Sequence, residues 1–206
     1  MSGLYAIKPR FVRSLGGIED RLVRRGVSAD RLSYTAVAVS VLAGVALGAG
    51  YTVHHRWWLA VGPLVLLRLA LNALDGSVAR RTGTARPFGK VVNEISDRLS
   101  DTFLIAPLVL FIPPLLVVVV LITTFITSAC GALGNVVGTG RLTKGPMGKA
   151  DRCLVLSIAA VIAGLTGVAV APFFLALVLV AIGGAITILG RLRALRDLAE
   201  EAAHVR

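Results

Sequence analysis

Residues 57–112 of the chain read WWLAVGPLVLLRLALNALDGSVARRTGTARPFGKVVNEISDRLSDTFLIAPLVLFI. Two apolar runs, 57–79 and 89–112, lie on either side of a short basic turn. Each run has about 20 residues, the length with which an α-helix crosses the hydrocarbon core of a bilayer. Comparable runs occupy the rest of the chain, at 32–50, 114–138, 153–170 and 172–190. The sequence therefore predicts an all-α integral membrane protein with six transmembrane helices.

The composition excludes an ordinary soluble domain. Apolar residues make up 56% of the chain and charged residues 16%, whereas soluble domains average about 25% charged residues. The 22 Lys and Arg against 11 Asp and Glu give a net charge of +11. These basic residues lie between the apolar runs rather than on a polar domain, so they indicate membrane topology and not a nucleic-acid partner.

The loop charges predict the orientation. Lys and Arg gather in residues 1–31, 80–90, 141–152 and 191–206, while the alternate loops hold only Arg56. Because basic loops stay on the cytoplasmic side, both termini are expected there, in a multi-pass protein of the cell membrane. The same topology places His54 and His55 in the first external loop and Trp57 and Trp58 at the outer interface.

The chain is predicted to form a single membrane domain over residues 1–206. Its parts are a cytoplasmic amphipathic helix at 1–28, a six-helix bundle at 32–190 and a cytoplasmic tail at 191–206. The amphipathic helix is predicted from apolar residues that recur three and four positions apart, which forms one apolar face. These residues are Leu4, Ile7, Phe11, Leu15, Ile18 and Leu22.

Polar residues inside the second and third runs form two stripes. Positions 68, 72, 75 and 79 share one helix face, and positions 89, 93, 97 and 101 share another. An ionised group near the bilayer midplane costs several kcal/mol unless it is paired or faces water. One or two polar residues are common as interhelical contacts, but these runs hold eight: Arg68, Asn72, Asp75, Asn93, Glu94, Asp97, Arg98 and Asp101. The stripes therefore predict a functional site.

Depth from the intervening turn, at about 1.5 Å per residue, predicts which residues pair. Arg68 should meet Asp101 in a buried structural ion pair, Asn72 should meet Asp97, and Asp75 should meet Asn93. The two shallower pairs offer the oxygen ligands that Mg²⁺ or Mn²⁺ prefers, close enough to the cytoplasm to admit an anionic substrate. Gly76 and Gly89 flank these pairs, either for a substrate against the backbone or for close helix packing.

The order NALDGSVAR over 72–80, eight residues, then GKVVNEISD over 89–97 resembles the CDP-alcohol phosphotransferase family. That family's pattern is D-x-x-D-G-x-x-A-R, eight residues, G-x-x-x-D-x-x-x-D. The resemblance implies transfer of a phosphatidyl group from a CDP-linked donor such as CDP-diacylglycerol to an alcohol, with release of CMP, in phospholipid biosynthesis. It also implies a divalent metal cofactor, Mg²⁺ or Mn²⁺, membrane lipids as partners, and a homodimer.

The resemblance carries roles to individual positions. It makes Asp97 the general base on the acceptor hydroxyl. The metal positions are Asn72, Asp75, Asn93 and Asp97, the nucleotide contacts are Gly76, Ala79, Arg80 and Gly89, and the expected acceptor contacts are Lys149, Arg152 and Arg141.

The chain departs from the pattern at Asn72 and Asn93, which replace two aspartates. An amide oxygen can ligate Mg²⁺ but brings no charge, so the number of metal ions stays open. An alternative is a non-catalytic CDP-lipid binder or partner subunit that uses the same groove. A small transporter is a weaker alternative, because the polar stripes lie toward one leaflet. The acceptor also stays open, and the basic loop at 141–152 slightly favours one that bears a phosphate.

Overall fold

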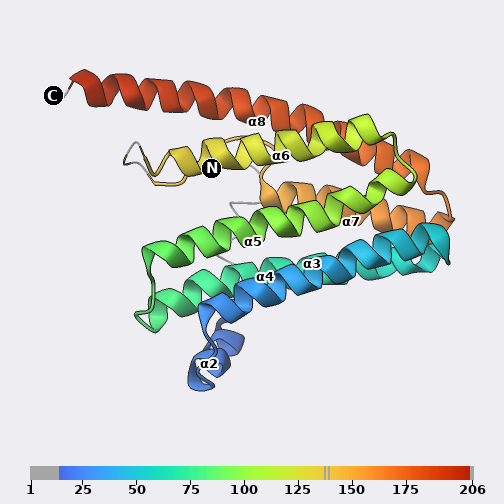
Figure 1. Ribbon diagram of the computed structural model, residues 1–206, viewed down its shortest axis with the longest axis horizontal. Coiled ribbons are helices and arrows are strands. Elements are labelled where there is room, and N and C mark those ends of the chain that lie inside the picture. Colours follow the sequence, from blue (N-terminus) through green and yellow to red (C-terminus); the bar gives the residue numbers. More distant parts are fainter. Residues whose placement is uncertain (1–13, 137, 139, 205–206) are drawn as a thin grey trace.

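The computed structural model describes residues 14–136, 138 and 140–204, and this part of the chain is helical with irregular connections. Six helices of 18 residues or more lie side by side, and Figure 1 shows their connections alternating between the two ends of the bundle. The helices are α2 (Gly16–Arg24), α3 (Ala29–Thr52), η2 (His55–Ala60), α4 (Val61–Arg81), α5 (Pro87–Ile105), η3 (Ala106–Leu110), α6 (Pro114–Leu133), α7 (Lys149–Thr166) and α8 (Val170–His204).

Local chemistry explains where several helices begin and end. The Ser28 hydroxyl accepts a hydrogen bond from the Arg31 amide at the start of α3, and Pro87 begins α5, where its missing N–H costs nothing. The Gly148 amide donates to Asp151 Oδ2 at 2.9 Å, which caps α7. At the other end of α7, Gly167 adopts φ +73°, the left-handed conformation that glycine tolerates best.

Among the described residues, four segments are long and apolar enough to cross a membrane: Ala29–Thr52, His55–Arg81, Pro114–Leu133 and Val170–Glu200. The chain is therefore a multi-pass membrane protein. The helices α5 and α7 lie among these four (Figure 1) but carry too many charged residues to qualify by composition. They are the helices that carry the polar residues described below.

Several predicted boundaries differ from the structure by a few residues, and two of them change an element. The run predicted to span 114–138 ends its helix at Leu133, because the chain turns there toward Gly138 and Gly140, both with positive φ. The predicted tail at 191–206 is not separate, since α8 continues without a break to His204.

The described part of the predicted amphipathic segment is α2, and residues 1–13 lie outside the described part of the chain. Leu22 and Val23 of α2 pack against a small buried cluster of Leu32, Leu74 and Val78. Salt bridges from Arg81 to α2 complete this attachment. The apolar face of α2 therefore rests partly on α3 and α4.

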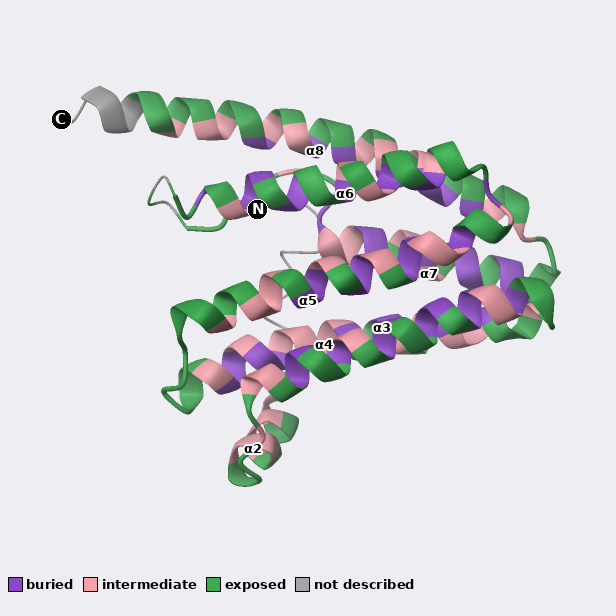
Figure 2. Ribbon diagram, viewed as in Figure 1, coloured by how far each residue is buried: buried purple, intermediate pink, exposed green. Residues whose placement is uncertain are grey.

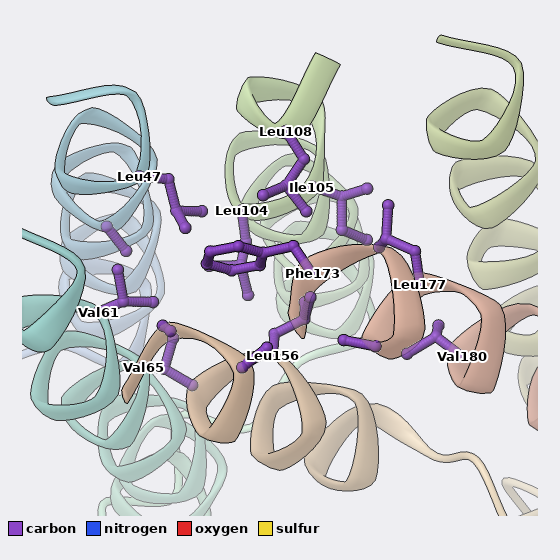
Figure 3. Packing of buried hydrophobic residues seen from close by; sticks show 14 of the residues in the cluster. Leu47, Val61, Val65, Leu104, Ile105, Leu108, Leu156, Phe173, Leu177 and Val180 are labelled. Carbon is purple, nitrogen blue, oxygen red and sulfur yellow. The ribbon is translucent and has the colours of Figure 1, made fainter. Parts of the chain in front are cut away.

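The main apolar core lies toward the end of the bundle opposite the α4–α5 turn, where α3, α4, α5, α7 and α8 meet (Figures 2 and 3). Trp58 is 2% exposed, and its indole Nε1 donates to the Leu47 carbonyl at 3.0 Å. Trp58 therefore does not form part of an exposed aromatic belt: η2 turns its ring inward against Phe111 and Phe173. Trp57 is half exposed.

The Trp58 ring leaves room for no side chain at position 50, because a Cβ on Gly50 would overlap the indole. We expect Gly50→Ala to lower the free energy of unfolding by about 1–3 kcal/mol, the cost of overpacking a core. Thermal unfolding of the purified chain in detergent micelles measures this change. Gly62→Ala in α4 is the matched control, since nothing lies within 4 Å of its Cβ. Equal stability of the two variants would show that the ring moves freely.

Candidate functional site

The deepest polar contact joins α4 to α5. Arg68 Nη2 lies 2.5 Å from Asp101 Oδ1, and the two side chains are 1% and 4% exposed. On α7, Arg152 Nη2 donates to the other oxygen of Asp101 at 3.1 Å. The same Arg68 nitrogen donates to the Asp97 carbonyl at 3.4 Å. One buried carboxylate therefore links three helices, with two guanidinium groups to balance its charge.

The next contact toward the α4–α5 turn joins Asn72 and Asp97. Asn72 Nδ2 donates to Asp97 Oδ1 at 3.0 Å, so the two polar stripes face one another as their spacing predicts. Lys149 at the start of α7 also donates its Nζ to Asp97 Oδ1. Here α4 and α5 contact one another through side chains. The backbone of each of these helices packs more closely on α3 than on the other.

Asp75 has a different partner from the predicted one. Its Oδ2 accepts a hydrogen bond from Ser33 Oγ of α3 at 2.8 Å, and its Oδ1 accepts from the Gly76 amide at 2.5 Å. The structure does not bring Asp75 together with Asn93 as a hydrogen-bonded pair. Sequence reasoning missed Ser33, because a serine 42 residues away at the start of an apolar run carries no signal of this contact.

The side-chain oxygens of Asn72 and Asn93 have no hydrogen-bond partner among the described residues, although both atoms are buried. An unpaired buried acceptor costs about 1–3 kcal/mol, so a ligand that satisfies both oxygens would be stabilised. A hard divalent cation is such a ligand, and Asp75 and Asp97 supply carboxylates nearby. No three His, Cys, Asp or Glu side chains gather in the described ranges. The described residues therefore offer two carboxylates and two amide oxygens here.

The predicted nucleotide contacts lie at the facing ends of α4 and α5. A Cβ on Gly76 would lie 3.3 Å from Arg80 Nη1, and a Cβ on Gly89 would lie 3.4 Å from Arg86 Cγ. Within the described part of the chain, neither glycine meets a neighbouring helix. Close packing between helices therefore does not explain the two glycines. Gly76 and Ala79 are partly exposed, and Arg80 beside them is exposed.

The predicted acceptor contacts all pair with carboxylates of α5. Arg141 binds Glu94 through both of its terminal nitrogens, Lys149 binds Asp97, and Arg152 binds Asp101. The side chains of Arg141 and Glu94 are 39% and 30% exposed, whereas those of Arg152 and Asp101 are both 4% exposed. Of the three basic residues, Arg141 is therefore the most accessible.

Comparison with known proteins identifies a family and several similar chains. Residues 27–189 match the family described as CDP-alcohol phosphatidyltransferase. The chain is 35% identical over 173 residues to Inner membrane protein YnbA of Escherichia coli, covering 82% of this chain and 81% of that protein. It is 33% identical over 142 residues to archaetidylinositol phosphate synthase of Aeropyrum pernix, covering 66% and 69%.

The fold resembles crystal structures of Mycobacterium tuberculosis phosphatidylinositol phosphate synthase. The structure with CDP-DAG bound has a TM-score of 0.72 at 21% identity and covers 89% of this chain and 94% of that one. The structure in complex with manganese and citrate has a TM-score of 0.71 at 21% identity and covers 87% of each chain. With the family match over most of the sequence, these similarities show that the chain belongs to the CDP-alcohol phosphatidyltransferase family.

Proposed function

We propose that the chain transfers a phosphatidyl group from a CDP-linked lipid such as CDP-diacylglycerol to an alcohol and releases CMP. The observation that carries this proposal is the hydrogen bond between Asn72 and Asp97, which closes the family motif across two helices. Family membership and a CDP-DAG-bound structural neighbour support the same reaction. A hydroxyl oxygen of the acceptor forms the new bond to phosphorus, the pyrophosphate P–O bond breaks, and CMP leaves with that electron pair.

Asp97 is the proposed general base. The hydrogen bonds from Asn72 and Lys149 both fall on Oδ1, so Oδ2 is the oxygen that takes the hydroxyl proton. The two donors hold the carboxylate in one orientation, which a base needs in order to lie within reach of that proton. The Arg68 bond to the Asp97 carbonyl fixes the backbone at the same point.

Asn72, Asp75, Asn93 and Asp97 are the proposed ligands of Mg²⁺ or Mn²⁺. A bound divalent cation would neutralise charge on the donor pyrophosphate and orient it. The unpaired amide oxygens support this assignment, as does the manganese in a structural neighbour. Ser33 would act as a positioning residue, because it orients Asp75 from a third helix. Gly76, Ala79, Arg80 and Gly89 are the proposed nucleotide contacts.

For the acceptor we propose an alcohol that carries a phosphate, bound by Arg141. Its guanidinium is the accessible basic group of the three that were expected there, and a phosphate can exchange with the Glu94 carboxylate at a half-exposed site. We assign Arg152 a structural role instead of an acceptor contact, since its pair with Asp101 is buried. The Aeropyrum pernix relative is by name a synthase of a phosphorylated lipid, archaetidylinositol phosphate, which supports this acceptor class.

The proposed topology has six spans, both termini in the cytoplasm and the site open to the same side. The basic α4–α5 turn and the end of α8 lie toward the same end of the bundle in Figure 1, which supports the side predicted from the loop charges. In this arrangement α5 and α7 complete the six, with Asp97 and Asp101 of α5 paired to Lys149 and Arg152 of α7. The homodimer stays a prediction of the family resemblance.

Replacing the base should stop turnover without loss of donor binding. We expect Asp97→Asn to lower the rate of CMP release from CDP-diacylglycerol by about 10²–10⁴-fold, the usual contribution of a general base. Asp197→Asn on the exposed part of α8 is the control and should retain the wild-type rate. An unchanged rate for Asp97→Asn would remove Asp97 from this role. Tight donor binding by the wild type with no CMP release, with any alcohol, would support the non-catalytic alternative.

Loss of the Ser33 hydroxyl should weaken metal binding, because Asp75 would lose a hydrogen bond that orients it. We expect Ser33→Ala to raise the Mn²⁺ concentration for half-maximal CMP release about tenfold, at the low end of effects seen for groups that orient metal ligands. Ser40→Ala is a matched control, because Ser40 is also buried on α3 but bonds only within its helix, to the Ala36 carbonyl. Equal Mn²⁺ requirements in the two variants would contradict the positioning role.

Loss of the Arg141 guanidinium should weaken binding of the acceptor and leave binding of the donor unchanged. We expect Arg141→Ala to raise the KM for a phosphate-bearing acceptor about tenfold or more, since a charge-assisted contact to phosphate is lost, with the KM for CDP-diacylglycerol unchanged. Arg196→Ala is the control, because Arg196 forms a similar but more exposed pair with Glu200. A panel of inositol phosphate, glycerol phosphate and their unphosphorylated alcohols measures the effect. Preference for an unphosphorylated alcohol would refute this acceptor class.

A further inference from the structure

We infer that Lys149 acts as a cation of the site, so that the chain holds one divalent metal ion beside the lysine ammonium that is ion-paired with Asp97. The inference rests on the proposed function and specifies its metal site. Lys149 Nζ is ion-paired with Asp97 Oδ1, and the two side chains are 18% and 11% exposed. The lysine therefore lies against the carboxylate proposed both as ligand and as base.

The charge of the ligand set supports a single metal ion. Of the four ligand positions, Asp75 and Asp97 carry negative charge, while Asn72 and Asn93 carry none. With the Lys149 ammonium beside Asp97, the two carboxylates leave a net charge of about −1, which one divalent cation already exceeds. A second divalent cation would face both the first and the Lys149 ammonium in a largely buried site, where like charges repel strongly because water screens them poorly.

The oxygen atoms available as ligands also support a single metal ion. Asp97 Oδ1 already receives hydrogen bonds from Asn72 and Lys149, and both oxygens of Asp75 accept hydrogen bonds. The amide oxygens of Asn72 and Asn93 are buried without a partner among the described residues, and Asp97 Oδ2 is the oxygen proposed to take the hydroxyl proton. Two neutral oxygens can complete the shell of one ion beside the carboxylates, but they add no charge to hold another.

The start of α7 holds Lys149 in this place. The preceding Gly148 amide is capped by Asp151 Oδ2, and the Met147 amide donates to Thr187 Oγ1 of α8 at 2.9 Å. One turn further along, Arg152 is fixed to the buried Asp101. The lysine backbone is thus anchored on both sides, so the ammonium is positioned by the fold and is not a mobile surface charge.

This assignment differs from an acceptor contact in its effect on metal binding. A lysine that bound only the acceptor would change the KM for that acceptor and leave Mn²⁺ binding as it was. A lysine that acts as the second cation repels the metal ion and occupies Asp97 Oδ1. Removing it should therefore tighten Mn²⁺ binding while it slows the reaction, two effects of opposite sign.

The test measures Mn²⁺ binding to the purified full chain in detergent micelles, by electron paramagnetic resonance of the free ion. We expect one Mn²⁺ per wild-type chain. In Lys149→Met we expect about tenfold tighter Mn²⁺ binding together with about 10²-fold slower CMP release, since a charge that stabilises the donor phosphates is lost. Lys144→Met, in the same loop and exposed, should match the wild type in both measurements.

Two Mn²⁺ per wild-type chain would overturn the inference and leave the proposed reaction intact. Unchanged or weaker Mn²⁺ binding in Lys149→Met would also overturn it. Absence of any Mn²⁺ binding would contradict the metal site of the proposed function itself. The wild-type stoichiometry tests the single metal ion even if Lys149→Met does not fold.

A double variant and a triple variant test the role of the lysine directly. Asn72→Asp with Asn93→Asp supplies four carboxylates but keeps Lys149, and we expect the second Mn²⁺ to bind at least about tenfold more weakly than the first. Adding Lys149→Met to that pair should let two Mn²⁺ bind with similar affinity. Equal binding of the second ion with and without Lys149 would refute its role as the second cation.

Discussion

The buried ion pair between Arg68 and Asp101 is the contact on which the site depends. Asp101 also binds Arg152, so one carboxylate joins α4, α5 and α7. Breaking such a pair leaves an uncompensated charge away from water, which is far more costly than the pair is stabilising. The network therefore fixes the register of three helices. Because Arg68 also reaches the Asp97 carbonyl, that register sets where the reactive carboxylate lies.

The helix α5 combines this polar network with an apolar outer face. Its exposed side includes Phe88, Val91, Ile95 and Leu99, while Asp97 and Asp101 point into the protein. This division explains how a helix with too many charges to qualify as a span by composition can lie among apolar neighbours. Its charged groups are paired within the bundle, and its outer surface is compatible with lipid.

The acidic stripe of α5 also organises the basic residues that follow it in the chain. Glu94, Asp97 and Asp101 lie at increasing depth and bind Arg141, Lys149 and Arg152 in that order. Burial increases along the series, so the same kind of pair has different consequences. The shallow pair can exchange its carboxylate for a substrate phosphate, whereas the deep pair is part of the fold.

Much of this protein follows from its sequence, because the bilayer fixes helix length and the α-helix fixes which residues share a face. Apolar run length predicted the helical elements, and the spacing of 68, 72, 97 and 101 predicted two contacts between α4 and α5. The tertiary structure alone decided the Ser33 bond to Asp75, the burial of Trp58, and the partners of Arg141, Lys149 and Arg152. Sequence periodicity shows which residues share a face of one helix, and a short turn shows only that two consecutive helices are neighbours. Contacts between residues about 40 or more positions apart depend instead on how all the helices pack, which no local pattern records.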